Sequence, residues 1–158
     1  MEKFHVSIQS PLEDLQDAGL LDAQATLVRF QGVDWLQWAL VSAEPPPNTT
    51  PEAFYFFEAK RPGEKLRETL LCVSGQHQTS TEIERHGPLC RLHYFFLEKT
   101  ISKGVFGFGA GKERIELSDR TMRDCTVEFA QQCLEAFLRG DLAALDQQIK
   151  HNDFEDSD

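Results

Sequence analysis

The chain has 158 residues, of which 41% are hydrophobic and 27% are charged, and its formal net charge is -10 with a pI near 4.9. These values are typical of one globular domain and exclude a largely disordered chain. The negative charge repels nucleic-acid backbones and anionic lipid surfaces, so it argues against both as partners. We expect a single domain over residues 1–150 and an acidic tail at 151–158 that has nothing to bury.

The N-terminal sequence MEKFHVSIQSPLEDLQ does not follow the basic, apolar and small-residue order of a secretory signal. The apolar runs are also shorter than the roughly 20 residues that span a bilayer. We therefore expect a cytoplasmic protein without membrane contact. In a reducing compartment cysteines stay free and often pack as small core residues, which is the prediction for Cys72, Cys90, Cys125 and Cys133.

The first elements in chain order are predicted to be a strand and a short helix. Residues 4–9 alternate apolar and polar side chains, which is the period of a half-buried strand. Ser10 is followed by Pro11 and Glu13, the pattern of an N-cap, a first-turn proline and a capping box. These residues predict a helix that ends at Gly19.

Residues 25–43 are apolar, with an interruption at Gln31 and Gly32. This pattern predicts a strand, a turn at 32–34 and a second strand, with a helix over 35–43 as the alternative. Residues 44–52, EPPPNTTPE, are predicted to form an exposed loop, because proline supplies no backbone donor and restricts the residue before it.

The middle of the chain predicts three strands that pair as hairpins. Residues 53–60 and 66–74 are apolar and flank the turn sequence RPGEK, so they are expected to form one hairpin. The polar stretch 75–88 is predicted as a long loop, and residues 89–99 as the next strand.

The C-terminal part of the chain predicts two helices. Ser118 is a candidate N-cap, and the apolar residues from Met122 to Phe137 recur at helical spacing. Gly140 is placed to end this helix, and Asp141 to cap a second one. The predicted fold is α+β: an antiparallel sheet of five to seven strands, with a short N-terminal helix and one or two C-terminal helices packed on one face.

The glycine-rich sequence GVFGFGAGKE at 104–113 resembles a phosphate-binding loop only superficially. Phe106 occupies the position where a P-loop needs glycine, and Glu113 the position where it needs a hydroxyl. The following residues alternate like a strand, whereas a phosphate loop opens a helix. No nucleotide cofactor is predicted. We interpret the stretch as a bent, glycine-faced strand or hairpin, whose exposed partner-binding residues are Phe106, Phe108 and Lys112.

Cysteine and histidine gather in one part of the chain, at Cys72, His77, His86, Cys90 and His93. Zinc needs four such ligands that converge, but neither a Cys-x-x-Cys motif nor a close histidine pair is present. On a regular strand Cys90 and His93 also face opposite ways. We therefore predict core thiols and solvated histidines, and no metal. Cys90 with His86 is the one local pair with the residue types of a nucleophilic site, and the chain shows no further catalytic constellation.

Two aromatic strand segments, FYFF at 54–57 and YFFL at 94–97, are apolar on both faces. A sheet with helices on one face needs only one apolar face. The second face must be covered by the chain's own helices or a rolled sheet, by a second subunit in a homodimer, or by a partner protein.

These observations favour a small acidic, non-enzymatic protein-binding module, such as an inhibitor, an immunity-like factor or a dedicated chaperone. Its charge would steer it to a basic protein partner. The alternative is a carrier or enzyme with an apolar small-molecule pocket inside a curved aromatic sheet. That pocket would be lined by Phe54, Phe56, Tyr94 and Phe96.

Overall fold

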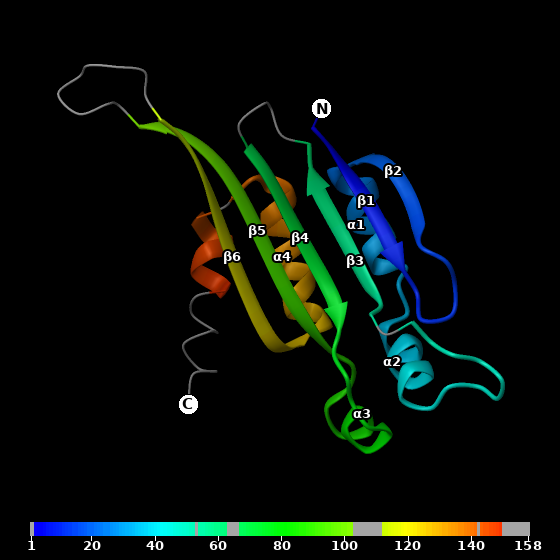
Figure 1. The fold of residues 1–158 in the computed structure, drawn as a ribbon. Coiled ribbons are helices and arrows are strands. Elements are labelled where there is room, and N and C mark those ends of the chain that lie inside the picture. Colours follow the sequence, from blue (N-terminus) through cyan, green and yellow to red (C-terminus); the bar gives the residue numbers. More distant parts are fainter. Residues whose placement is uncertain (1, 53, 63–66, 103–111, 142, 150–158) are drawn as a thin grey trace.

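The computed structural model describes residues 2–52, 54–62, 67–102, 112–141 and 143–149. Six strands form one sheet in the order β2-β1-β3-β4-β5-β6, and all neighbours are antiparallel (Figure 1). The strands are β1 (Lys3–Gln9), β2 (Gln16–Asp22), β3 (Phe56–Arg61), β4 (Arg67–Gly75), β5 (Leu89–Ser102) and β6 (Lys112–Thr126). The helices are α1 (Ala23–Gln31), α2 (Trp35–Ala43), α3 (Ser80–His86), α4 (Val127–Arg139) and a segment at 143–149. The predicted α+β class with an antiparallel sheet is confirmed.

The core lies between one face of the sheet and helices α1 and α4, which Figure 1 shows behind the strands. Phe4 and Phe57 on the sheet pack with Phe30 of α1 and Phe137 of α4, and all four are buried. In the part of the chain that the structure describes, no helix lies across the opposite face of the sheet, which we call the open face (Figure 1). None of the described helices is long and apolar enough to cross a membrane.

The connection from β1 to β2 is a turn, so the predicted helix ending at Gly19 is wrong. Ser10 Oγ accepts a hydrogen bond from the Glu13 amide at 3.1 Å, as a helix cap would. The Gln9 side-chain amide donates to the carbonyls of Ser10 and Glu13 and fixes the turn. The following residues pair with β1, with a register shift after the pair that Val6 makes with Gly19. Pairing with β1 gives hydrogen-bond partners to backbone groups along residues 16–22. These bonds together stabilise the strand more than the single capping bond at Ser10 would stabilise a helix.

Residues 23–43 form helices α1 and α2, so the two predicted strands are wrong and the alternative helix over 35–43 is confirmed. Asp22 Oδ1 accepts from the Ala25 amide at 2.7 Å and caps α1. Asp34 Oδ1 accepts from the Gln37 amide at 3.1 Å and caps α2. Each cap satisfies an amide that a free helix end leaves unpaired. The buried residues of each helix are four apart, namely Thr26 and Phe30, and Trp35 and Ala39.

The hairpin of β3 and β4 and the strand β5 are confirmed, with bounds that differ by a few residues from the prediction. The polar stretch between β4 and β5 contains α3, which was predicted as loop. Thr79 Oγ1 accepts from the Glu82 amide at 3.2 Å and also contacts the Glu82 carboxylate. This is the start of a capping box, so the sequence signal for α3 is the threonine and the glutamate three residues later.

Helix α4 begins at Val127 and not at the predicted Ser118, because the preceding residues belong to β6. Thr126 Oγ1 accepts from the Phe129 amide at 3.1 Å and is the actual N-cap. Met122 is buried as a residue of β6, so it does not belong to the apolar face of the helix.

The end of α4 agrees with the prediction. Gly140 has a φ of 75 and forms the left-handed C-cap, a conformation that glycine adopts without strain. Asp141 Oδ1 accepts from the Ala144 amide at 3.1 Å and caps the helical segment 143–149.

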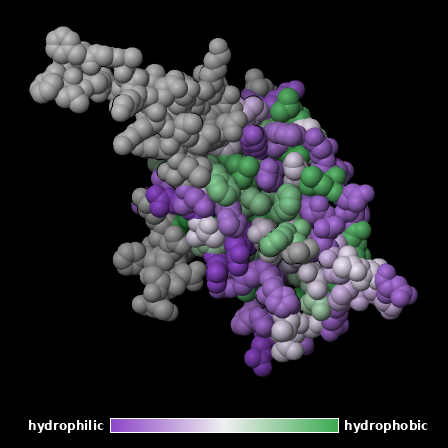
Figure 2. All heavy atoms as spheres, in the orientation of Figure 1, coloured by the Kyte–Doolittle hydropathy of each residue, from purple (hydrophilic) through white to green (hydrophobic). Residues whose placement is uncertain are grey.

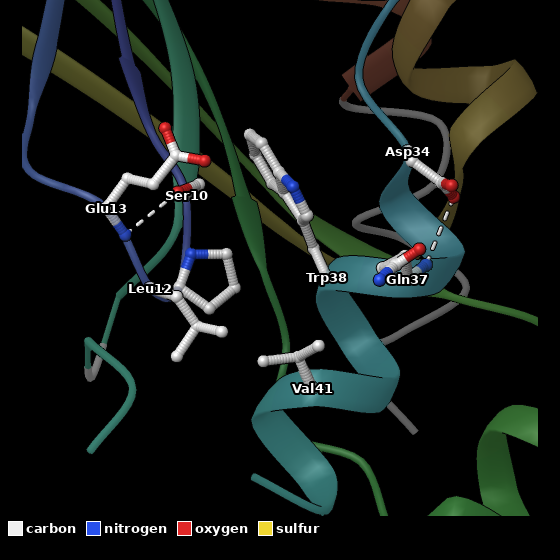
Figure 3. A pocket seen from close by; sticks show the side chains of 8 residues that line it. Ser10, Leu12, Glu13, Asp34, Gln37, Trp38 and Val41 are labelled. Carbon is white, nitrogen blue, oxygen red and sulfur yellow. Dashed lines mark hydrogen bonds between the residues drawn. The ribbon is translucent and has the colours of Figure 1, made fainter. Parts of the chain in front are cut away.

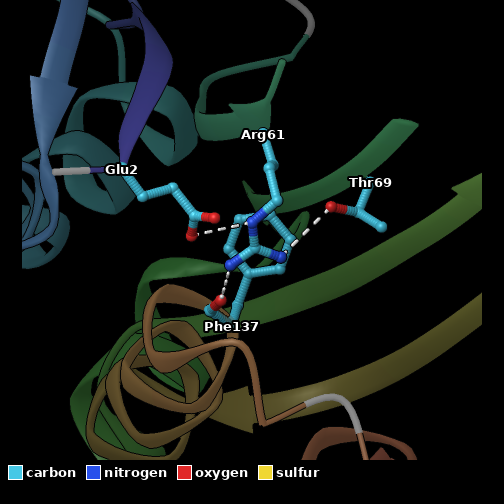
Figure 4. A network of polar contacts seen from close by, with 4 residues as sticks. All are labelled: Glu2, Arg61, Thr69 and Phe137. Carbon is cyan, nitrogen blue, oxygen red and sulfur yellow. Dashed lines mark hydrogen bonds and ion pairs between the residues drawn. The ribbon is translucent and has the colours of Figure 1, made fainter. Parts of the chain in front are cut away.

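Arg61, at the end of β3, joins the sheet to α4 (Figure 4). Its Nη2 donates to the Phe137 carbonyl at 2.7 Å, its Nε to Glu2 Oε1 at 3.0 Å and its Nη1 to Thr69 Oγ1 at 3.4 Å. The guanidinium carbon lies 5.1 Å from the ring centroid of Phe4 and 5.0 Å from that of Phe137. The cation is therefore held by two aromatic rings and a helix C-terminus together.

Candidate functional site

The open face carries two rows of side chains that run across the strands. One row contains Ser7, Glu58, Cys72, His93 and Thr121 as successive register partners. The other contains Leu20, His5, Lys60, Leu70, Phe95 and Asp119. Because side chains alternate along a strand, these residues face away from the buried Phe57, Leu71 and Leu92.

Apolar side chains lie among polar and charged ones on the open face, where Phe56 is in a further row with Gln9 and Ser74. Phe56, Leu70 and Phe95 are half-buried, and Leu20 is 57% exposed. Figure 2 looks onto this face and shows hydrophobic atoms over the central strands, with hydrophilic atoms around them. A half-exposed apolar area with a polar rim is the usual composition of a protein interface.

Burial is the main cause of the pKa shifts of the ionisable side chains in the middle of the open face. It raises the pKa of Cys72 to about 12, and the neighbouring Glu58 carboxylate adds to that rise. Burial also raises the pKa of Glu58, partly offset by Lys60 and His5. It lowers the pKa of His93, whose Nδ1 lies 3.3 Å from Thr121 Oγ1. Cys72 and His93 are register partners, but desolvation keeps the thiol protonated, so the pair lacks an activated nucleophile.

We expect Cys72, Cys90 and Cys133 to resist alkylation in the native protein. Burial raises the pKa of each to about 12, which leaves a thiolate fraction on the order of 1 in 100,000 near pH 7. Iodoacetamide treatment followed by peptide mass spectrometry should show all three unmodified in the native chain and modified in denaturant. Cys72 is the critical one because it is only half-buried. Native labelling of Cys72 as fast as in denaturant would contradict the assignment.

The cysteines and histidines that cluster in the sequence are spread over different surfaces. Cys72 and His93 lie on the open face, so the prediction that Cys72 is a core thiol is wrong, whereas Cys90 is fully buried as predicted. His77 and His86 are exposed in the connection between β4 and β5. Among the described residues, no three His, Cys, Asp or Glu side chains gather as a group that could hold a metal ion.

Of the three residues predicted to bind a partner, Phe106 and Phe108 are outside the described residues. Lys112 is the first residue of β6, and its register partner is Ser102.

The four residues of the alternative pocket do not share one surface. Phe56 lies on the open face, whereas Tyr94 is buried on the helix-covered face as the register partner of Leu71. Phe54 precedes β3 and is 71% exposed. For Phe96 the structure gives the backbone pairing with Thr69. The described members of the set therefore do not enclose a ligand.

A second surface feature lies on the helix side of the sheet, and we call it the Trp38 groove. It consists of two hollows that share Asp34 and Trp38. The first has a volume of about 220 Å³ and lies between α2 and the turn after β1, where its apolar lining is Pro11, Leu12, Trp38 and Val41 (Figure 3). The second has a volume of about 330 Å³ and extends to Ile8, Val28, Arg29 and Val33.

The charges around the first hollow have one sign. Glu13 stands on the turn side and Asp34 on the α2 side, and Ser10 and Gln37 complete the polar lining. Of the described residues that line this hollow, none is basic. In Figure 3 the Trp38 ring projects from α2 toward the turn. The hollow thus has the Trp38 ring beside the Glu13 side of the turn, whereas the Asp34 carboxylate is directed to the Gln37 amide that it caps.

Trp38 is supported from behind by an aromatic cluster. Its ring centroid lies 5.5 Å from that of Trp35 and 6.1 Å from that of Tyr55, both with edge-to-face geometry. Tyr55 is 4% exposed, and its carbonyl accepts a hydrogen bond from the Gly75 amide at 2.8 Å. A Cβ atom at Gly75 would lie 1.9 Å from Tyr55 Cζ. Because Gly75 has no side chain, the Tyr55 ring can lie close to the backbone at Gly75, and Trp38 packs against this ring.

Comparisons with protein-family models, with curated proteins and with solved structures found no match to this chain.

Proposed function

We propose that the protein is a non-enzymatic binding module that takes a basic protein partner on its open face. The observation that carries the proposal is the unequal covering of the sheet. Helices α1 and α4 pack on one face, while Phe56, Leu70 and Phe95 remain half-buried on the other. Completing the burial of these side chains would contribute roughly 25 cal/mol for each Å² of apolar surface removed from water.

The negative net charge of the chain favours a positively charged partner protein. The net charge of -10 accelerates the approach of a basic protein, and salt would slow that approach. Glu58 and Lys60 lie among these apolar side chains on β3, and His5 and Asp119 lie further out on β1 and β6, so polar contacts would fix the orientation of the partner.

The test is to isolate the chain from its source at low salt, identify the bound protein by native mass spectrometry, and reconstitute the complex from the two purified components. Leu70→Lys places a charge in the apolar centre and is expected to raise the Kd at least about tenfold, which corresponds to about 1.4 kcal/mol. Leu36→Lys is the matched control, because Leu36 is 49% exposed on α2, away from the open face.

Three results would contradict the proposal. The chain could be isolated without a bound protein, or with a bound small molecule instead. A reconstituted complex could also show the same affinity in Leu70→Lys as in wild type.

A further inference from the structure

We propose that the second hollow of the Trp38 groove binds a small apolar carboxylate, and that Arg29 is the residue that pairs with the carboxylate group. The hollow is lined by residues of β1, β2, α1 and α2 and by the connection between the two helices. It lies on the helix side of the sheet and is separate from the open face. The site therefore goes beyond the function proposed above.

The size and the lining of the second hollow suit a small molecule. Its volume of about 330 Å³ lies at the lower end of the roughly 300–1,000 Å³ of small-molecule sites. Its apolar lining consists of Ile8, Val28, Val33 and Trp38. Small-molecule sites usually combine such an apolar lining with a few polar groups that orient the ligand. We therefore expect a ligand with an apolar body and one polar group.

Arg29 indicates the chemistry of that polar group. Among the described residues its guanidinium has no ion-pair or hydrogen-bond partner, whereas Arg61 and Arg120 each pair with a carboxylate. A guanidinium presents two parallel donors that match the two oxygens of a carboxylate. The side-chain amide of Gln16 lines the same hollow and can donate a further hydrogen bond. The polar group of the ligand is therefore expected to be a carboxylate.

Asp34 and the net charge of the chain both oppose an anion, but less strongly than contact with Arg29 favours it. Asp34 also lines the hollow, yet its carboxylate is directed to the Gln37 amide, whose nitrogen lies 3.1 Å from Oδ1 (Figure 3). The net charge of -10 is spread over the whole chain, and salt screens charges beyond about 8 Å at physiological ionic strength. We therefore expect Asp34 to lower the affinity for a carboxylate without abolishing binding.

The walls of the second hollow are held in place by the fold itself. Trp38 packs against Trp35 and Tyr55. At the end of α1, the Gly32 amide donates to the Val28 carbonyl at 3.0 Å. Strand β1, which contributes to the lining, is paired with β2 on one side and with β3 on the other. A preformed site reduces the ordering cost of binding.

The test uses the full chain and sodium hexanoate, followed through the Trp38 indole N–H signal in NMR titrations. The chain has two tryptophans, and Trp38→Phe identifies the signal. We expect a saturable shift in the low-millimolar range. Hexanamide keeps the shape and removes the charge, so it should bind about tenfold more weakly. Butyrate is two methylene groups shorter and should also bind about tenfold more weakly, because less apolar surface is buried.

Arg29→Gln should weaken hexanoate binding about fivefold or more and leave hexanamide binding unchanged, because only the carboxylate pairs with the guanidinium. Glutamine is a good helix former and the Asp22 cap remains, so α1 is retained. Arg85→Gln is the matched control. It makes the same chemical change in the last turn of α3, outside the lining of the hollow, and should bind hexanoate like wild type.

Asp34→Asn tests the sign of the ligand charge. Asparagine is as good an N-cap as aspartate, and removal of the like charge should tighten hexanoate binding about twofold. Equal binding of hexanoate and hexanamide, equal loss in Arg29→Gln and Arg85→Gln, weaker hexanoate binding in Asp34→Asn, or no saturable shift at Trp38 would each overturn the carboxylate site. Leu70→Lys should leave the titration unchanged, so failure of this site is distinguishable from failure of the proposed open-face function.

Discussion

Gly75→Ala is expected to lower the free energy of unfolding by about 2–3 kcal/mol, as overpacked cores do. The added Cβ would lie 1.9 Å from Tyr55 Cζ and 2.0 Å from Cε2, so the ring must move. Tyr55 cannot move cheaply, because it is buried between Trp35, Trp38 and the end of β4. Urea unfolding measures the loss, and near-ultraviolet circular dichroism should show the displaced tryptophans.

The matched control for this steric effect is Gly32→Ala. At Gly32 an added Cβ meets its nearest atoms at 3.5 and 3.6 Å, which is ordinary contact, and the φ of -78 suits alanine. Its stability should be unchanged or slightly higher. In a Tyr55→Val background, Gly75→Ala should cost much less than in wild type. An equal cost in both backgrounds would show that the ring is not the cause.

Arg61→Ala is expected to lower the free energy of unfolding by about 3 kcal/mol, which combines a lost charge-assisted hydrogen bond with lost cation–π contacts. The side chain is 17% exposed and fills the space between Phe4 and Phe137. Arg61→Lys should recover less than half of the loss, because an ammonium does not reproduce the planar fork. Thermal and urea unfolding of the three proteins gives the comparison.

Glu2→Gln measures how much the ion pair with Arg61 contributes to stability, separately from the packing of Arg61 on the aromatic rings. The Glu2 side chain is 55% exposed, so its ion pair with Arg61 is expected to contribute less than about 1 kcal/mol. If Glu2→Gln destabilised the protein as much as Arg61→Ala, the ion pair would be the main term and the aromatic contacts would be secondary.

The fold class could be predicted from the sequence because strand alternation and turn residues are local signals. The β3–β4 hairpin and the Gly140 helix stop are examples. Errors arose where local and long-range preferences disagreed. Ser10 has the geometry of a helix cap, yet its segment pairs with β1. In residues 23–43, continuous apolar composition obscured the helical period, although Asp22 and Asp34 were available as cap signals.

The candidate surfaces were less predictable than the fold. Residues 54–57 did indicate a sheet with a second apolar face, and Phe56 lies on the open face. The Trp38 groove was missed, because Glu13 and Trp38 come from segments with the wrong predicted structure. Their proximity depends on how the β1–β2 turn packs beside α2, and sequence separation carries no such information.

The irregular edge at β2 restricts how another protein can approach. A regular outer strand offers its backbone as a template for further strands and for aggregation. Here the register shift beside Gly19 breaks that template, and Asp17 adds an exposed negative charge. The Gly19 amide, and then the His5 side chain, hold the pKa of Asp17 below its usual value, so the charge persists in mild acid. Strand addition at this edge is therefore disfavoured, and self-association into extended sheets is discouraged on the side of the molecule where Leu20 is exposed.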